Sequence, residues 1–417
     1  MTTDQDARRN YSVLLAQGIA SNAATELTSV RLVLPFLYMS VGAPVFFAGM
    51  LVPLSTVAKR GVQILVAPLV SAARSHKGFM VLAALLTAMA LVFVSLTFNV
   101  AGVYWLVPIF LFAALVIGGA SGLGALAFQD MIGRYLSSER RRRLLFTQSS
   151  LAGLFVVIVA LGSQLVLKPG TSFAAHQELI WLGISLFLLS ALVIMAVREP
   201  AASQPSGDGA ARENRGGQIA ALRDSFRIAF ALPWFGRYLT ARTLYLSIEL
   251  AIPFFSIHAA SFHGNSISGL NAFVIAANVG LMAGGPLWAW IGKRSVSMIL
   301  SLAAGLTCIG GLLAMAIELR LLPQSIFLYA LVFVFVSLGV QGVKNGRTLY
   351  LIGAANDEER PFCIAVANVT IGMVAVAFGA VLGVLASFQG VAWPIFALVA
   401  LNVLAALYTF RLRDVRR

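Results

Sequence analysis

Long apolar stretches separated by short polar connections run through the whole chain. Crossing a hydrocarbon core of about 30 Å takes roughly 20 apolar residues in a helix, and the stretches are of this length. Backbone groups in lipid must bond within their own segment, so each stretch is expected to be helical. The pattern predicts an all-α membrane protein with twelve transmembrane helices, near residues 13–38, 44–71, 78–98, 104–129, 144–167, 178–197, 233–259, 265–291, 296–317, 323–346, 361–387 and 391–411.

Composition strengthens this prediction. The 417 residues are 59% hydrophobic and 11% charged, whereas soluble domains carry about 25% charged residues. The net charge of +14 does not indicate nucleic-acid binding, because Lys and Arg lie in the short connections rather than on one basic domain. Membrane lipid is therefore the expected environment, and no nucleic-acid partner is expected.

No cofactor, metal or enzymatic site is expected. Cys308 and Cys363 fall inside apolar stretches without Cys-x-x-Cys spacing or a neighbouring His. No phosphate-binding GxxxxGK[ST] sequence and no clustered nucleophile and base are found. The polar amino terminus, MTTDQDARRN, is unlike a cleaved signal peptide, so the first stretch is expected to be a retained helix.

A polar segment divides the stretches into two sets of six. Residues 199–217 are rich in Pro, Gly, Ala and charge, as linkers are. We expect an amino-terminal bundle at 1–198, a cytoplasmic linker at 199–231 and a carboxyl-terminal bundle at 232–417. Arg223, Asp224 and Arg227 recur at helical spacing, which fits either an interfacial helix or an extended start to the seventh stretch.

Basic residues gather in alternate connections, which predicts the orientation. Cytoplasmic connections carry the excess of Lys and Arg, so both termini are expected in the cytoplasm of a bacterial inner-membrane protein. An even number of spans agrees with this. The basic positions are Arg8, Arg9, Arg74, Lys77, Arg134, Arg140, Arg141, Arg142, Arg143, Lys293, Arg294, Arg411, Arg413, Arg416 and Arg417.

The two halves resemble each other. VRLVLPF at 30–36 matches IELAIPF at 248–254, and APL at 67–69 matches GPL at 285–287, each pair being 218 positions apart. IGRYLSSER at 132–140 also matches IGAANDEER at 352–360. Together these matches indicate a duplication of six helices, with a solute cavity between the copies.

The chain resembles the major facilitator superfamily of transporters over its whole length. That family carries a Gly-x-x-x-Asp-Arg-x-Gly-Arg-Arg signature after the second and eighth helices. The carboxyl-half copy, GPLWAWIGKR, keeps Gly285, Leu287, Gly292, Lys293 and Arg294 but has Ala289 at the acidic position, and the amino-half copy, APLVSAARSHK, has Ser71 there.

The resemblance implies two pseudo-symmetric six-helix bundles and alternating access to a central site. In the family, the signature's carboxylate locks the cytoplasmic side, and that lock is missing here. Asp130, Arg134 and Glu139 lie in the fourth connection as substitute gate partners beside Lys293 and Arg294, although such a charge run also serves as a topology anchor.

Ionisable residues inside the apolar stretches are the candidate site, because each costs about 2.5–3.5 kcal/mol to insert and faces water or a partner. Six are cations and two are carboxylates: Arg31, Lys59, Arg60, Arg242, Lys344, Arg347, Glu26 and Glu249. The excess predicts an anionic solute. Alternatively, Lys59, Lys344 and Arg347 contact the cavity mouth and leave a balanced core.

Specific roles follow from these positions. Arg31, Arg60 and Arg242 are expected to bind the substrate. Tyr38, Tyr245 and Asn368 either hydrogen-bond it or bond across helices. Glu26 and Glu249 are the candidates for proton coupling, and Arg31 and Glu249, 218 positions apart, are hypothesised to pair. His258, near the outer end of the seventh stretch, and His263, in the outer loop, are expected to be wetted surface residues rather than proton relays.

The predicted function is that of a monomeric secondary active transporter that moves a small, anionic solute with protons by alternating access. The alternative is a non-transporting membrane protein of the same architecture, such as an assembly factor or a sensor. A membrane enzyme ranks third.

Overall fold

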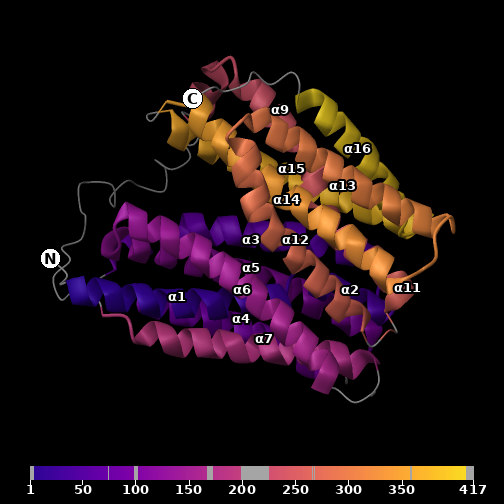
Figure 1. Ribbon diagram of the computed structural model, residues 1–417, viewed down its shortest axis with the longest axis horizontal. Helices are drawn as coiled ribbons and strands as arrows, with labels where there is room; N and C mark the ends of the chain where they lie inside the picture. The colour runs from indigo at the N-terminus through magenta and orange to yellow at the C-terminus, as the bar shows by residue number, and fades with distance from the viewer. Residues whose placement is uncertain are drawn as a thin grey trace. The chain divides into compact units, whose positions relative to one another are not determined.

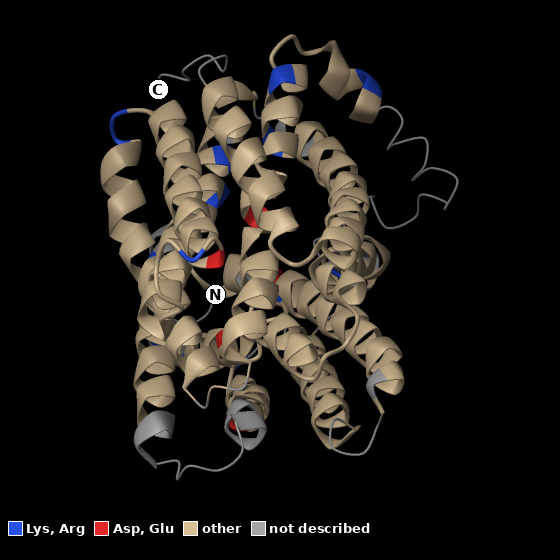
Figure 2. Cartoon of the chain, turned by 90° about the vertical axis from the view of Figure 1, so that its right-hand side faces the viewer, with Lys and Arg blue, Asp and Glu red and all other residues tan. Residues whose placement is uncertain are grey.

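The computed structural model describes residues 4–409, apart from 74, 98–101, 167–171, 199–224, 265, 267, 357 and 358. Within that part of the chain the secondary structure is helical, without strands. Figure 1 traces the helices, and Figure 2 shows how few Lys, Arg, Asp and Glu residues they carry. The expected all-α class is confirmed.

The helices of the amino-terminal half are α1 (Asp4–Leu27), α2 (Val33–Ser40), α3 (Val45–Ala72), α4 (Lys77–Thr97), α5 (Val103–Tyr135), α6 (Ser138–Val166) and α7 (Ser172–Met195). Those of the carboxyl-terminal half are α9 (Phe235–Leu244), α10 (Leu246–Glu249), α11 (Ala251–His263), α12 (Gly269–Gly292), α13 (Val296–Glu318), α14 (Ile326–Ala354), α15 (Arg360–Gln389) and α16 (Trp393–Thr409).

Ten segments of the described chain are long and apolar enough to cross a membrane. They coincide with ten of the twelve predicted stretches. The twelfth stretch is the shorter apolar helix α16, and the first is divided between α1 and α2. The chain is thus a multi-pass membrane protein, and the count of twelve spans stays a prediction.

The chain forms two compact units. Unit 1 comprises Met1–Ala43, Leu54–Arg212 and Asn265–Val274, and unit 2 comprises Pro44–Pro53, Glu213–Gly264 and Ile275–Arg417. The first part of α3 thus clusters with unit 2, and the first turns of α12 cluster with unit 1. A short helix at 225–231 precedes α9 and is separated from it by residues 232–234, so the seventh span does not simply extend backwards.

In unit 1, α1 packs against α6 and α7, and α4 packs against α5 and α7 (Figure 1). Polar side chains bridge these helices at buried positions. The Gln148 amide donates to the Leu14 carbonyl over 2.7 Å, and the Gln17 amide donates to the Ser190 hydroxyl over 3.1 Å. Hydrogen bonds of this kind hold helices together in a bilayer, where lipid tails are as apolar as the helix surfaces and the hydrophobic effect does not drive helices to associate.

In unit 2, α13 packs against α14 and α16, and α11 lies against the same two helices (Figure 1). Gly311 of α13 faces the Val399 side chain of α16, and Gly310 faces Val336 of α14. Small residues at these contacts let the helices approach closely.

The first and seventh spans are both interrupted at equivalent positions. Proline has no N–H and its ring clashes with the carbonyl four residues earlier, which for Pro35 is Arg31 and for Pro253 is Glu249. Helix α2 begins at Val33 and α11 at Ala251, again 218 positions apart. Since Pro286 lies inside the continuous α12, proline does not force a break, and the recurrence supports the duplication seen in the sequence.

Glycines permit close contact between α5 and α3 in unit 1. A Cβ atom on Gly118 would overlap the Ser55 backbone carbonyl, and one on Gly122 would overlap that of Lys59. Backbone atoms cannot rotate away as side-chain ends can. A side chain on either glycine would therefore separate the two helices.

Gly118→Ala is expected to lower the stability of the detergent-solubilised protein, because overpacking typically costs about 1–3 kcal/mol. Thermal unfolding followed by fluorescence would measure the change. Gly133→Ala on the same helix is the matched control, since a Cβ there meets nothing within 4 Å. Equal stability of the two variants would contradict the close approach of α5 and α3.

Candidate functional site

The interrupted seventh span carries two of the predicted site residues. Tyr245 and Leu250 mark its breaks, with φ and ψ of −68° and −9° and of −89° and 0°. The Ile248 N–H donates to the Tyr245 carbonyl over 3.0 Å, a tighter turn than an α-helix has. Arg242 therefore lies in the last turn of α9 and Glu249 at the end of α10.

Glu249 forms an ion pair with Arg347 of α14, both within unit 2. The Arg347 guanidinium donates from Nη1 to Glu249 Oε1, and the two side chains are only 20% and 29% exposed. Sequence reasoning identified both residues as deep charges but did not pair them, because nothing in the spacing of α10 and α14 along the chain shows their contact.

Arg242 is a buried cation with a neutral partner. The residue is 8% exposed, and its Nη2 donates to the Asn368 Oδ1 of α15 over 2.9 Å. In the described part of the chain its Nε–H has no hydrogen-bond acceptor. Of the residues predicted to bind substrate, Arg242 and Asn368 are thus brought together.

Sequence reasoning missed Tyr238, which lies beside Arg242, and Tyr350, which stacks on Tyr238. The rings of Tyr238 and Tyr350 stack with centroids 5.6 Å apart and an interplanar angle of 2°. The Tyr238 hydroxyl is within hydrogen-bonding reach of the Arg242 guanidinium. The available signal was spacing, because Tyr238 precedes Arg242 by four residues and shares its helix face.

Tyr245 connects helices in this structure. Its hydroxyl bonds to Thr409 of α16 at a buried position, and the neighbouring Ser247 hydroxyl donates to Asn402 of the same helix. These bonds hold the broken segment against α16. Of the two roles considered for Tyr245, the interhelical one matches its contacts.

The predicted residues of unit 1 are more dispersed. Tyr38 of α2 is buried and contacts the Phe110 ring edge-on, with centroids 5.3 Å apart. Its hydroxyl has no hydrogen-bond partner among the described residues. Arg60 donates to Gln63 one turn further along α3, over 3.2 Å. Glu26 is half-buried in the last turn of α1, and Arg31 is exposed in the break before α2.

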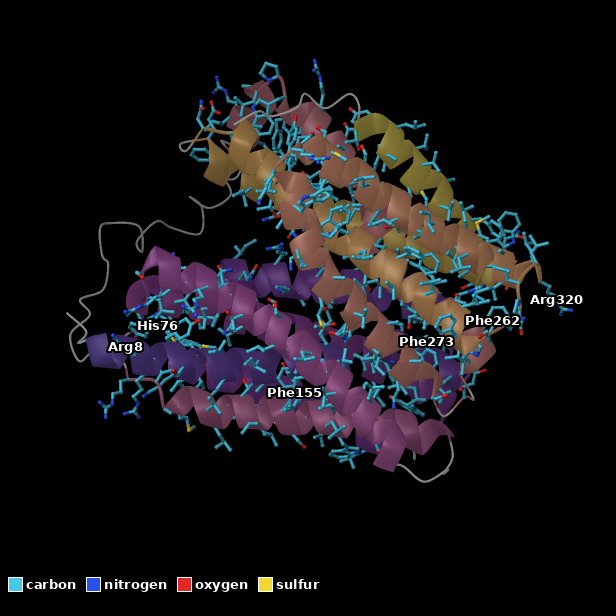
Figure 3. The ribbon with its side chains drawn as sticks, in the orientation of Figure 1. Arg8, His76, Phe155, Phe262, Phe273 and Arg320 are labelled. Atoms are coloured by element: carbon cyan, nitrogen blue, oxygen red, sulfur yellow. The ribbon has the colours of Figure 1, made fainter. Side chains whose placement is uncertain are left out.

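The predicted gate residues have partly unexpected surroundings. Asp130, near the end of α5, contacts the buried ring of His76, with 2.6 Å between Oδ2 and Nε2; Figure 3 labels His76 in unit 1. Lys293 and Arg294 are exposed, and Arg294 lies 4.8 Å above the Trp290 ring. The Arg134 side chain lies outside the described residues.

The expectation for the two outer histidines was wrong. His258 is fully buried and His263 is 7% exposed, and His263 is the last residue of α11 rather than part of a loop. His258 lies on the face of α11 that contacts α14, where its ring bonds to Tyr329. The sequence could place His258 near the end of the seventh span, but it could not show which face of the helix carries it.

Among the described residues, no group of three or more His, Cys, Asp or Glu could hold a metal ion. Cys308 and Cys363 are both free thiols.

Comparisons with known proteins place the chain by its fold. None of the protein-family models matches it. An uncharacterized protein of Mycobacterium tuberculosis and one of Mycobacterium bovis are each 28% identical over 411 residues, covering 97% of this chain and 77% of theirs.

Solved transporter structures share the fold at low sequence identity. A mutant of the nucleoside transporter NupG has a TM-score of 0.72 at 10% identity, covering 97% of this chain and 99% of its own. A D-xylose–proton symporter has a TM-score of 0.67 at 14% identity, with 97% of both chains covered. FucP, a major facilitator superfamily transporter, has 0.56 at 13%, covering 98% and 99%. The chain has the fold of the major facilitator superfamily of membrane transporters.

Proposed function

We propose that this protein is a secondary active transporter that moves a small anionic solute together with a proton by alternating access. Proteins with this fold include a nucleoside transporter and a D-xylose–proton symporter, which supports solute transport as the general activity. The charges of unit 2 support the choice of an anion.

The state of Arg242 is the observation that carries this proposal. Removing a guanidinium from water is costly unless charge and hydrogen bonds replace the lost hydration. Asn368 supplies one neutral acceptor, and among the described residues the Nε–H has none. A carboxylate or phosphate oxygen would supply both the missing acceptor and the missing charge, because guanidinium groups bind such oxygens in pairs.

The stacked pair Tyr238 and Tyr350 suits a small solute with a flat or apolar body. Aromatic rings contribute contact area without charge, and Tyr238, on which Tyr350 stacks, lies beside the cationic group. An anion bound to Arg242 would thus have an aromatic surface next to its charged end.

The Glu249–Arg347 pair offers a route to proton coupling. If an anion takes the place of Glu249 at Arg347, the carboxylate loses its counter-charge. A carboxylate left in a low-dielectric site without a cation is favoured in its protonated form. One proton would then accompany each anion, and release of the anion would let Arg347 recover Glu249 and expel the proton.

Arg242→Gln should abolish stabilisation by small organic anions. A ligand at a hundred times its dissociation constant stabilises the folded state by about 2.7 kcal/mol, so a screen of carboxylates and phosphate esters by thermal unfolding in detergent can detect it. The matched control is Arg237→Gln, an exposed arginine on the same helix α9. Anions that stabilise the wild type and both variants equally would argue against the Arg242 site.

Glu249→Gln and Arg347→Gln are expected to destabilise the protein singly by about 1–3 kcal/mol, because each leaves a partly buried charge without its partner. The double variant should cost less than the sum of the two, as interacting residues do. A double-mutant cycle by chemical unfolding measures this coupling. Strict additivity would show that the pair has no energetic role.

A further inference from the structure

A second group of titratable side chains lies in unit 2, at the end of α11 away from Arg242. The His258 ring bonds on both sides: its Nδ1 to the Tyr329 hydroxyl of α14, and its Nε2 to Glu318 Oε2 of α13 over 3.1 Å. His258 and Tyr329 are fully buried, and the Glu318 side chain is 35% exposed. Figure 3 labels Phe262 on α11 and Arg320 just after α13 at this same end.

We propose that the His258–Tyr329–Glu318 cluster is a proton-binding site, loaded from the membrane face that the positive-inside rule assigns to the outside. Its role in coupling rests on the transport function proposed above. Proton binding at the cluster itself does not depend on that function.

The hydrogen bonds of His258 accommodate both charge states of the ring. In the neutral state, Nε2–H donates to Glu318 and Nδ1 accepts from the Tyr329 hydroxyl. In the cationic state, both nitrogens donate and the Tyr329 oxygen accepts. A tyrosine hydroxyl both donates and accepts, so its rotation allows a proton to be bound or released without leaving a buried ring nitrogen unpaired.

The position of Glu318 gives an independent reason for the cluster. Glu318 is the last residue of α13, where a carboxylate faces the negative end of the helix dipole. The helix end is held by Leu321, whose N–H donates to the Ala316 carbonyl over 2.9 Å, and by Arg320 with φ of 57°. A carboxylate kept at this unfavourable position gains from a cation, and protonated His258 supplies one.

Glu318 also provides the path for the proton. It is the half-exposed member of the cluster, whereas the other two members have no exposed surface. A proton from water can therefore reach Glu318 first. When the neutral ring is in the tautomer whose Nδ1–H donates to Tyr329, the protonated Glu318 carboxyl transfers this proton along the 3.1 Å bond to the unprotonated His258 Nε2. The result is a cationic ring beside a carboxylate.

The surrounding charges are few. On α11, the His263 ring contacts Tyr329 with centroids 6.0 Å apart. Arg320, two residues after Glu318, is exposed. The facing helix α16 carries no Asp, Glu, Lys, Arg or His, and the charged residue of α10 is Glu249. Among these charged groups, Glu318 is the one that bonds directly to the His258 ring, and it favours the cationic form that burial of the ring disfavours.

The cluster is joined to the substrate site through the seventh span. His258 lies on α11, which begins directly after the break at Leu250 that follows Glu249. Protonation changes the contact between His258 of α11 and Glu318 of α13. If two conformations of the seventh span bind the proton with different affinity, protonation shifts the equilibrium between them.

The direct test is titration of the ¹⁵N-histidine-labelled protein by NMR in detergent over about pH 4.5 to 9, a range that brackets ordinary histidine and carboxyl groups. The four histidines make assignment by single substitution practical. We expect the His258 signal to change charge state over about two pH units, as one proton site does. Glu318→Gln should shift this midpoint to lower pH, since it removes the anion that favours the cationic ring.

His258→Gln removes the titration but keeps a donor and an acceptor for Glu318 and Tyr329, so folding is expected to persist. His263→Gln is the matched control at a second buried histidine and should leave the His258 midpoint within a few tenths of a pH unit. A His258 ring that keeps one charge state over the whole range, in wild type and in Glu318→Gln alike, overturns the proposal.

Coupling is tested separately, by electron spin resonance distances between labels at Tyr104 and Leu321, which are 87% and 73% exposed, in a variant without Cys308 and Cys363. We expect the distance distribution to change with pH in this background and to lose that dependence with His258→Gln added. If His258 titrates but the distance distribution does not change with pH, the cluster is a proton site that is not coupled to a change of conformation. If the wild-type protein binds none of the small organic anions in the thermal-unfolding screen, that result contradicts the transport proposal and leaves the proton site standing.

Discussion

A charge inside the hydrocarbon layer must find a partner within the protein or from a ligand, and this constraint organises unit 2. Glu249 meets it through Arg347, and Glu318 meets it through His258. Arg242 meets it only in part, because Asn368 and the nearby Tyr238 hydroxyl are both neutral and its Nε–H has no acceptor among the described residues. The incomplete pairing of Arg242 is the basis for proposing a binding site there.

Two prolines lie beside charged residues at the breaks in the first and seventh spans. Pro35 and Pro253 stand at equivalent points of the duplicated sequence, and each lacks the N–H that would bond to the residue four positions earlier. Those earlier residues are Arg31 and Glu249, at or beside the breaks in the first and seventh spans. An interrupted span releases backbone groups and allows a side chain to leave the regular helical face, as solute sites of transporters require. The duplication therefore places a charged residue at the corresponding point of each half.

The apolar spans were predictable from sequence, because hydrophobic length and charge depletion are properties of single segments. The partners were not. Glu249 and Arg347 are separated by 98 positions, and His258 and Tyr329 by 71, so their contacts depend on helix rotation and packing. His258 shows the difference most clearly: its place near the end of a span was right, and its exposure was wrong, because the face it occupies is set by α13 and α14.

The central claim is that the cation at Arg242 receives a transported anion together with a proton. Proteoliposomes that contain a pH-sensitive dye measure both at once when panels of small organic anions and of neutral sugars and nucleosides are added outside. The account predicts internal acidification on addition of a subset of the anions and none with the neutral solutes. Acidification or uptake with a neutral solute alone, and with none of the anions, would contradict it.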